Sequence, residues 1–135
     1  MWTHEYVGET DATPEAVWRV LRDLDNWDRW DTSMEKVELS GPFEVGSQVS
    51  MTPTGQEPIV STIIGIRENE YYADLTHFAG LELRFSHTLE RLANGGTRVL
   101  HRLEIDGAGG EEVGPQITED FPDAMAALLA YAAKG

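Results

Sequence analysis

Two runs of strictly alternating residues flank the segment "ANGG" in the second half of the chain. In each run, apolar residues and one histidine occupy every second position: Leu83, Phe85, His87 and Leu89, then Val99, His101, Leu103 and Ile105. A period of two is typical of a β-strand with one buried face, and Asn-Gly favours a tight hairpin. Residues 81–92 and 96–106 are therefore predicted to be paired antiparallel strands with two inward histidines.

The length of the turn decides how these histidines face each other. A two-residue Asn94-Gly95 loop would place odd positions opposite even ones, against the alternation, whereas a three-residue loop with a left-handed glycine restores it. If the loop is 93–95, His87 lies directly opposite His101; if it is 94–96, the two are diagonal neighbours. Cross-strand neighbours have Cβ atoms roughly 4.5 to 8 Å apart, so the imidazoles are within reach in both cases.

The rest of the chain predicts five more strands and three helices. The strands are expected at 2–10, 34–39, 48–53, 58–67 and 70–77. After the first, Thr13 and Pro14 are typical of a helix start, and "DNWDRW" predicts a second short helix. Residues 111–135 predict a long helix that Pro122 should kink and Gly135 should end.

These elements predict an α+β fold. Consecutive strands with short connections favour an antiparallel sheet, and only the C-terminal helix is long enough to cover its apolar face. The seven-stranded sheet is therefore expected to curl around that helix, as a single domain over residues 1–135. Such a curl leaves space between the helix and the far strands.

Composition excludes several classes of site. The chain has no cysteine, which excludes disulfides, thiolate metal sites and a cysteine nucleophile and is compatible with a cytoplasmic location. Ten basic against 24 acidic residues give a net charge of -14. This charge repels the phosphates of nucleic acids and anionic membrane surfaces, and the longest small and apolar run, residues 124–133, is too short to span a bilayer. We expect neither a nucleic acid nor a membrane as partner.

Four segments carry a family resemblance: "ATPEAVWRVLRDLDNWDRW" at 12–30, "GPFEVGS" at 41–47, "GGTRV" at 95–99 and "EDFPDAMAALLAYA" at 119–132. With them the chain resembles the START-like, helix-grip superfamily, and within it the polyketide cyclase/dehydrase branch. The resemblance implies a hydrophobic cavity between the curled sheet and the long helix, in which relatives bind lipids, hormones or polyketides. The family has no universal catalytic residue, so the site must be argued from the side chains that face the cavity.

The alternation predicts which side chains these are. Expected inward sets are the odd residues of 70–77 and the even residues of 58–67, whereas strand 2–10 leaves two options, His4 with Tyr6 or the set Thr3, Glu5 and Val7. The predicted ligand-binding residues are Trp30, Met51, His77, Phe85, His87, His101, Leu103, Ile117, Phe121 and Met125.

Inward histidines require an explanation, because an unpaired buried polar group costs about 1 to 3 kcal/mol. Four interpretations are open. His87 and His101 could bond each other, a water or a carbonyl as core residues. They could orient a ligand, or act as acid and base in a cyclisation, as a coupled pair and the candidate catalytic residues. Metal binding with His77 lacks the usual ligand spacing. The glycine-rich segments are turns rather than phosphate-binding loops, so we expect no metal and no cofactor.

The expected function is binding of a small hydrophobic, lipid-like or polyketide-like molecule, with cyclase or dehydratase activity as an extension. The alternative is a non-catalytic carrier, a sensor or a protein-interaction module on the same fold. We expect a monomer or a homodimer.

Overall fold

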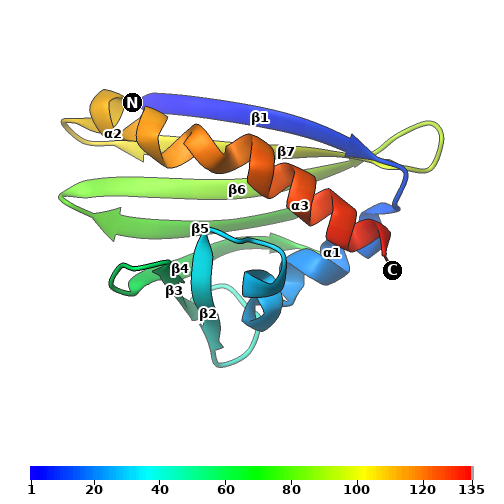
Figure 1. Ribbon diagram of the computed structural model, residues 1–135, viewed down its shortest axis with the longest axis horizontal. Helices are drawn as coiled ribbons and strands as arrows, with labels where there is room; N and C mark the ends of the chain where they lie inside the picture. The colour runs from blue at the N-terminus through cyan, green and yellow to red at the C-terminus, as the bar shows by residue number, and fades with distance from the viewer. Residues whose placement is uncertain (135) are drawn as a thin grey trace.

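The computed structural model describes residues 1–134 and contains one seven-stranded antiparallel sheet (Figure 1). Its strand order is β1-β7-β6-β5-β4-β3-β2, so that the first strand pairs with the last and the other neighbours follow the chain. The strands are β1 (Trp2–Thr10), β2 (Met34–Ser40), β3 (Gln48–Pro53), β4 (Ile59–Arg67), β5 (Tyr71–Phe78), β6 (Leu81–Arg91) and β7 (Thr97–Asp106). Each lies within one residue of its predicted range at either end.

Two short helices connect β1 to β2, as predicted. In α1 (Pro14–Arg22), the Thr13 side chain accepts a hydrogen bond from the Ala16 backbone N–H at 3.2 Å, which caps the helix. The following 3₁₀ helix, η1 (Leu24–Arg29), carries Trp27. Within residues 1–134, no helix combines the length and the apolar character needed to cross a membrane.

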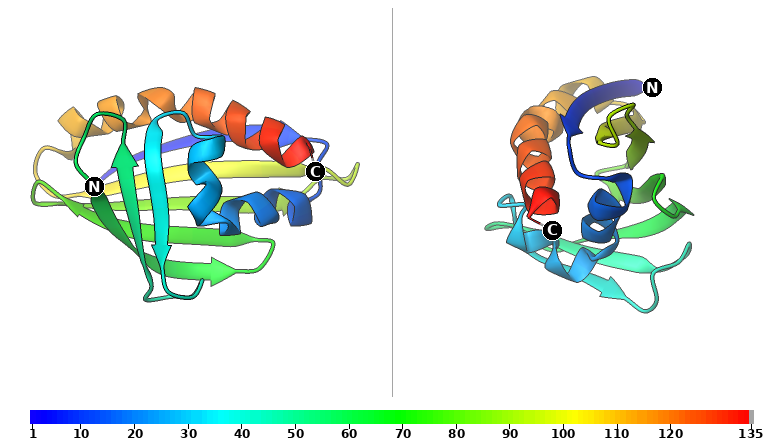
Figure 2. Two further views of the ribbon diagram at one scale, coloured as in Figure 1. Left: turned by 60° about the horizontal axis from the view of Figure 1, so that its bottom comes forward. Right: turned by 90° about the vertical axis from the view of Figure 1, so that its right-hand side faces the viewer.

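The C-terminal helical segment lies across the inner side of the curved sheet, and its end packs beside α1 (Figures 1 and 2). It consists of α2 (Gly110–Ile117), the 3₁₀ turn η2 (Thr118–Asp120) and α3 (Phe121–Ala133). The interruption therefore precedes Pro122, which lies in the first turn of α3, where its missing N–H costs no helical hydrogen bond. The predicted end at Gly135 lies outside the described residues. This arrangement confirms the predicted helix-grip fold.

The β6–β7 hairpin has the first of the two predicted registers. The Leu92 N–H donates to the Gly96 carbonyl and the Gly95 N–H to the Leu92 carbonyl, each at 2.9 Å. Gly95 is left-handed, with φ 88°, as a three-residue loop requires. Consequently His87 lies directly opposite His101.

Two predicted strand faces are wrong. On β5 the even residues Tyr72, Asp74 and Thr76 are buried, and His77 is exposed. The pairing with β6 sets this orientation, because Tyr72 is opposite the inward His87. On β4, Ser61 and Ile63 are buried while Val60 and Ile64 are 50% and 36% exposed. A bulge between Ile63 and Gly65 then returns Ile66 to the inner face opposite Tyr72.

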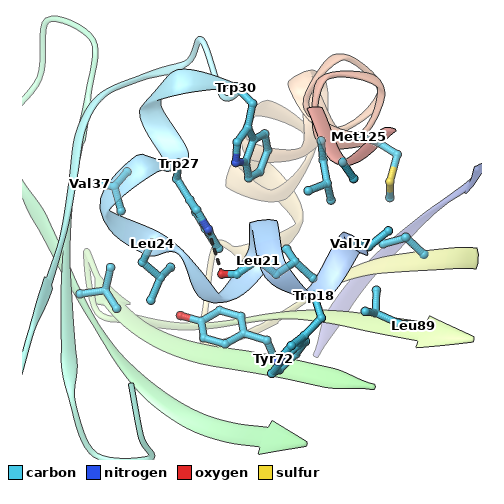
Figure 3. Close-up of a cluster of buried hydrophobic side chains, with 14 of the residues drawn as sticks. Val17, Trp18, Leu21, Leu24, Trp27, Trp30, Val37, Tyr72, Leu89 and Met125 are labelled. Atoms are coloured by element: carbon cyan, nitrogen blue, oxygen red, sulfur yellow. Dashed lines mark hydrogen bonds between the residues drawn. The ribbon is translucent and has the colours of Figure 1, made fainter. Parts of the chain in front are cut away.

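On β1 the open choice is resolved in favour of His4 and Tyr6, since the even positions are the less exposed ones. Around this inner face, the larger hydrophobic core joins α1, η1 and α3 to the sheet (Figure 3). Its tryptophan on η1, Trp27, is fixed by a hydrogen bond from Nε1 to the Leu21 carbonyl at 3.0 Å. A second, smaller hydrophobic core contains Leu103 and Phe121.

Candidate functional site

A cavity of about 170 Å³ lies between the inner face of the sheet, η1 and the C-terminal helical segment. Much of its wall is aromatic, aliphatic or thioether surface, contributed by Trp27, Trp30, Met34, Met51, Phe85, Ile117, Phe121, Ala124, Met125 and Leu128. Its polar members are Asp31, Ser33, Tyr72, Asp74, His87, His101 and Asp120. An apolar enclosure with a few convergent polar groups is the usual form of a small-molecule site.

The two histidines form part of a ring stack in this wall. The His87 and His101 ring centroids are 4.0 Å apart with an interplanar angle of 15°, and His101 stacks on Phe121 with the same values. Imidazole donors and acceptors lie in the plane of the ring, so stacked imidazoles cannot hydrogen-bond each other. The interpretation that His87 and His101 hydrogen-bond each other is therefore wrong. The nitrogens lie at the edges of the stacked rings.

Burial keeps both imidazoles neutral. His87 is 7% exposed, and the loss of hydration lowers its pKa to about 4. The pKa of His101 is also well below its usual range, first because of burial and then because of the neighbouring His87 and His4. Near pH 7 each ring thus offers one N–H donor and one acceptor nitrogen.

A buried carboxyl group belongs to the same cavity wall. Asp74 is 2% exposed and faces inward on β5 beside Phe85 of β6. The Tyr72 hydroxyl donates to Asp74 Oδ2 at 3.0 Å, whereas Asp74 Oδ1 has no hydrogen-bond partner. Burial raises the pKa of Asp74 to about 7, and the Tyr72 hydrogen bond offsets this only in part. Burial beside Asp74 also raises the pKa of Tyr72, which stays protonated.

The indole of Trp30 is a second unsatisfied group. Its Nε1 is buried without a partner, in contrast to that of neighbouring Trp27, which donates to Leu21 (Figure 3). Most buried polar groups in proteins are hydrogen-bonded. Two residues of the cavity wall thus carry a buried polar atom without a partner, an acceptor at Asp74 and a donor at Trp30.

Carboxylates mark another edge of the cavity, where the loop after η1 approaches η2. Asp31 accepts hydrogen bonds from the Ser33 N–H and hydroxyl at 3.0 and 2.6 Å. Asp120 of η2 lies in the same wall, and its pKa is raised by burial and then by Asp31. A second depression of about 130 Å³ shares Asp31, Ser33 and Asp120 and extends to exposed Asp123.

The structure places eight of the ten predicted residues in the cavity wall: Trp30, Met51, Phe85, His87, His101, Ile117, Phe121 and Met125. His77 is exposed near the end of β5, because the inner face of that strand carries even positions. Leu103 does face inward but is fully buried in the smaller core, where neighbouring side chains cover it.

Sequence reasoning missed the Tyr72–Asp74 pair and the acidic edge. The available signal was a charged residue in the middle of the strand "YYADLTHF", where most positions are apolar or uncharged. Among residues 1–134, no three histidine, aspartate or glutamate side chains are grouped so that they could hold a metal ion.

Comparisons with known proteins agree with this architecture. The family model described as polyketide cyclase / dehydrase and lipid transport matches residues 1–133. A comparison with curated sequences found no match.

Solved structures share the fold at low identity. The chain superposes on Ara h 8.0201 with TM-score 0.80 and 18% identity, covering 99% of both chains. For MLL2253 of Mesorhizobium loti the values are 0.83 and 14%, with 98% of both chains covered. For a START superfamily protein of Mycobacterium smegmatis they are 0.77 and 16%, covering 98% of this chain and 97% of that one. With the family match over nearly its whole length, the chain belongs to the polyketide cyclase / dehydrase and lipid transport family.

Proposed function

We propose that this protein binds one small, mainly apolar molecule in the cavity between the sheet and α3. The observation that carries the proposal is the combination of an apolar wall with unpaired polar atoms on Asp74 and Trp30. A cavity filled by its own side chains, as in a pure protein-interaction module, would leave no such space. Family membership supports the same class of ligand.

The volume limits what can be enclosed. A cavity of about 150 Å³ lined by aliphatic and aromatic side chains holds a benzene molecule, and this one measures about 170 Å³. The body of the ligand inside the cavity is therefore about the size of one ring or a short branched chain. A longer lipid or a polyketide would extend through the mouth.

The polar groups orient the molecule. An unsatisfied buried donor or acceptor costs about 1 to 3 kcal/mol, and a ligand that supplies the missing partner recovers part of this. Asp74, Trp30, His87 and His101 all belong to the wall and are the residues from which such hydrogen bonds would come. A molecule with a polar group on an apolar body suits this arrangement better than a pure hydrocarbon does.

Acid/base catalysis on the bound molecule is a second candidate function. A general acid or base works best with a pKa near the operating pH, and that of Asp74 is about 7. The lowered pKa of His87 makes its imidazole a weaker base. In a cyclase or dehydratase, Asp74 is therefore the better proton carrier, and the histidines would hold the substrate.

The test starts with native mass spectrometry of the purified protein, followed by titration with a neutral one-ring fluorophore, 4-(dimethylamino)benzonitrile, whose emission depends on the polarity of its surroundings. A co-purified small molecule, or saturable dye binding weakened by His87→Ala, supports the proposal. A clean mass without dye binding contradicts it. With a ligand in hand, conversion of that ligand to a product identifies an enzyme. In an enzyme, substitution of Asp74 should lower turnover, whereas substitution of His87 should lower affinity in an enzyme, a carrier or a sensor alike.

A further inference from the structure

The charges of the cavity restrict the class of ligand. Three carboxyl groups lie in its wall, those of Asp31, Asp74 and Asp120. Within residues 1–134, no lysine or arginine side chain is part of that wall. Because both histidines are neutral near pH 7, the side chains of the wall provide no positive charge to receive a ligand carboxylate or phosphate.

Asp74 is the group that most needs a partner. A buried carboxylate is stable only when it is paired or fully hydrogen-bonded, and the Tyr72 hydroxyl satisfies only one of its oxygens. The other oxygen, Oδ1, has no donor. A positively charged N–H group would supply both the missing hydrogen bond and the missing counter-charge.

The surrounding rings also favour a cation. Trp27, Trp30, Tyr72 and Phe85 all line the cavity that contains Asp74. The faces of aromatic rings attract ammonium groups, most strongly where water is excluded. The carboxylates of Asp31 and Asp120 at the edge add attraction along the approach.

We propose that the ligand is a protonated amine on an apolar body of about one ring, with its ammonium group paired to the Asp74 carboxylate. This inference rests on the proposed function and specifies its ligand class. It places fatty acids and other carboxylate ligands among the poorly bound molecules, because the ligand carboxylate would lie near the carboxyl groups of Asp31, Asp74 and Asp120.

The test compares three probes with the same apolar body and different charge: 2-phenylethylamine, 2-phenylethanol and phenylacetate. Their dissociation constants for the full chain are measured at pH 8 by protein-observed NMR titration. We expect the amine to bind about tenfold or more tightly than the alcohol, as a charge-assisted hydrogen bond implies, and phenylacetate to bind most weakly. Equal or tighter binding of the alcohol or of phenylacetate overturns the proposal.

The variant Asp74→Asn removes the charge at nearly constant shape. It should abolish the preference for the amine over the alcohol and leave the affinity for the alcohol within about threefold. The matched control Asp106→Asn removes an equal charge at an exposed position outside the cavity and should retain the preference. A preference that survives in Asp74→Asn contradicts the proposal.

The pH dependence of the affinity of the unmodified protein for the probes tests the proposal without a variant. Alkyl ammonium groups titrate near pH 10, so the amine stays charged from pH 6 to 8, while Asp74 ionises over this range. Amine affinity should rise severalfold with pH, and alcohol affinity should not. The other titratable groups of the wall are Tyr72, His87, His101, Asp31 and Asp120. If the pH dependence persists in Asp74→Asn, one of these is responsible and the proposal fails.

Failure of this inference can be told apart from failure of the proposed function. If the one-ring fluorophore binds and the amine shows no advantage, the cavity binds ligands but does not select a cation. If neither the fluorophore nor any of the three probes binds, both proposals fall.

Discussion

The imidazole rings of His87 and His101 stack face to face, 4.0 Å between centroids, directly across the β6–β7 pair. Two charged imidazolium rings at this distance would repel each other strongly, and burial penalises even one. The stack is therefore compatible only with neutral rings near pH 7. This requirement connects the wall of the cavity to the acid stability of the fold.

The stability of the His87→Phe variant relative to wild type should increase as the pH falls. The pKa of His87 is lowered to about 4 in the folded state, so the unfolded chain takes up the proton first as the pH falls below about 6.5. As the pH falls from about 6.5 to about 4, the native protein therefore loses stability, by on the order of 3 kcal/mol. Urea unfolding should show the difference between His87→Phe and wild type shifting in favour of the variant from pH 7 to 4.5. His77→Phe, at an exposed site, should show no such shift, and a pH-independent difference for His87→Phe contradicts the account.

For Asp74→Asn, the stability relative to wild type should have the opposite pH dependence and increase as the pH rises. Burial raises the pKa of Asp74 to about 7, so in the range from about 4 to 7 the native protein holds a proton that the unfolded chain has released. Wild-type stability should fall as the pH rises through this range, by on the order of 4 kcal/mol from this group. Unfolding curves at pH 4.5 and 8 should show the variant gaining relative to wild type with rising pH. If Asp106→Asn behaves in the same way, Asp74 is not the cause.

Gly114→Ala should destabilise the protein although alanine is the better helix former. A Cβ atom at this position of α2 would lie 2.5 Å from two atoms of the Trp2 indole, and such overpacking typically costs about 1 to 3 kcal/mol. The melting temperature of the single variant should therefore drop. Adding Trp2→Ala should remove the penalty of Gly114→Ala, so that the pair is non-additive. Additive effects of the two substitutions would show that this contact is not the origin.

The hairpin around Gly95 shows what sequence reasoning could determine. Strict alternation on both sides of one short turn leaves few registers, and the choice of His87 opposite His101 was one of only two. The covering helix was also predictable, since no other segment could bury the apolar face of the sheet.

The polar half of the site was less accessible to such reasoning. In "YYADLTHF" both faces contain aromatic and polar residues, so alternation does not distinguish the side of Asp74 from that of His77. Carboxylates usually face water, and only the pairing of β5 with β6 shows that this one is buried. The bulge in β4 likewise depends on the partner strand and inverts the face of part of the strand.

The most direct test of the cavity as the binding site is a titration of the neutral probe 2-phenylethanol into wild type and two variants of α3. Ala124 lines the cavity, whereas Ala126 of the same helix is exposed and outside it. The account predicts saturable binding of one molecule to wild type, at least a tenfold loss in Ala124→Phe, where the new ring fills the space, and unchanged binding in Ala126→Phe. Unaltered binding in Ala124→Phe, or none in wild type, would contradict it.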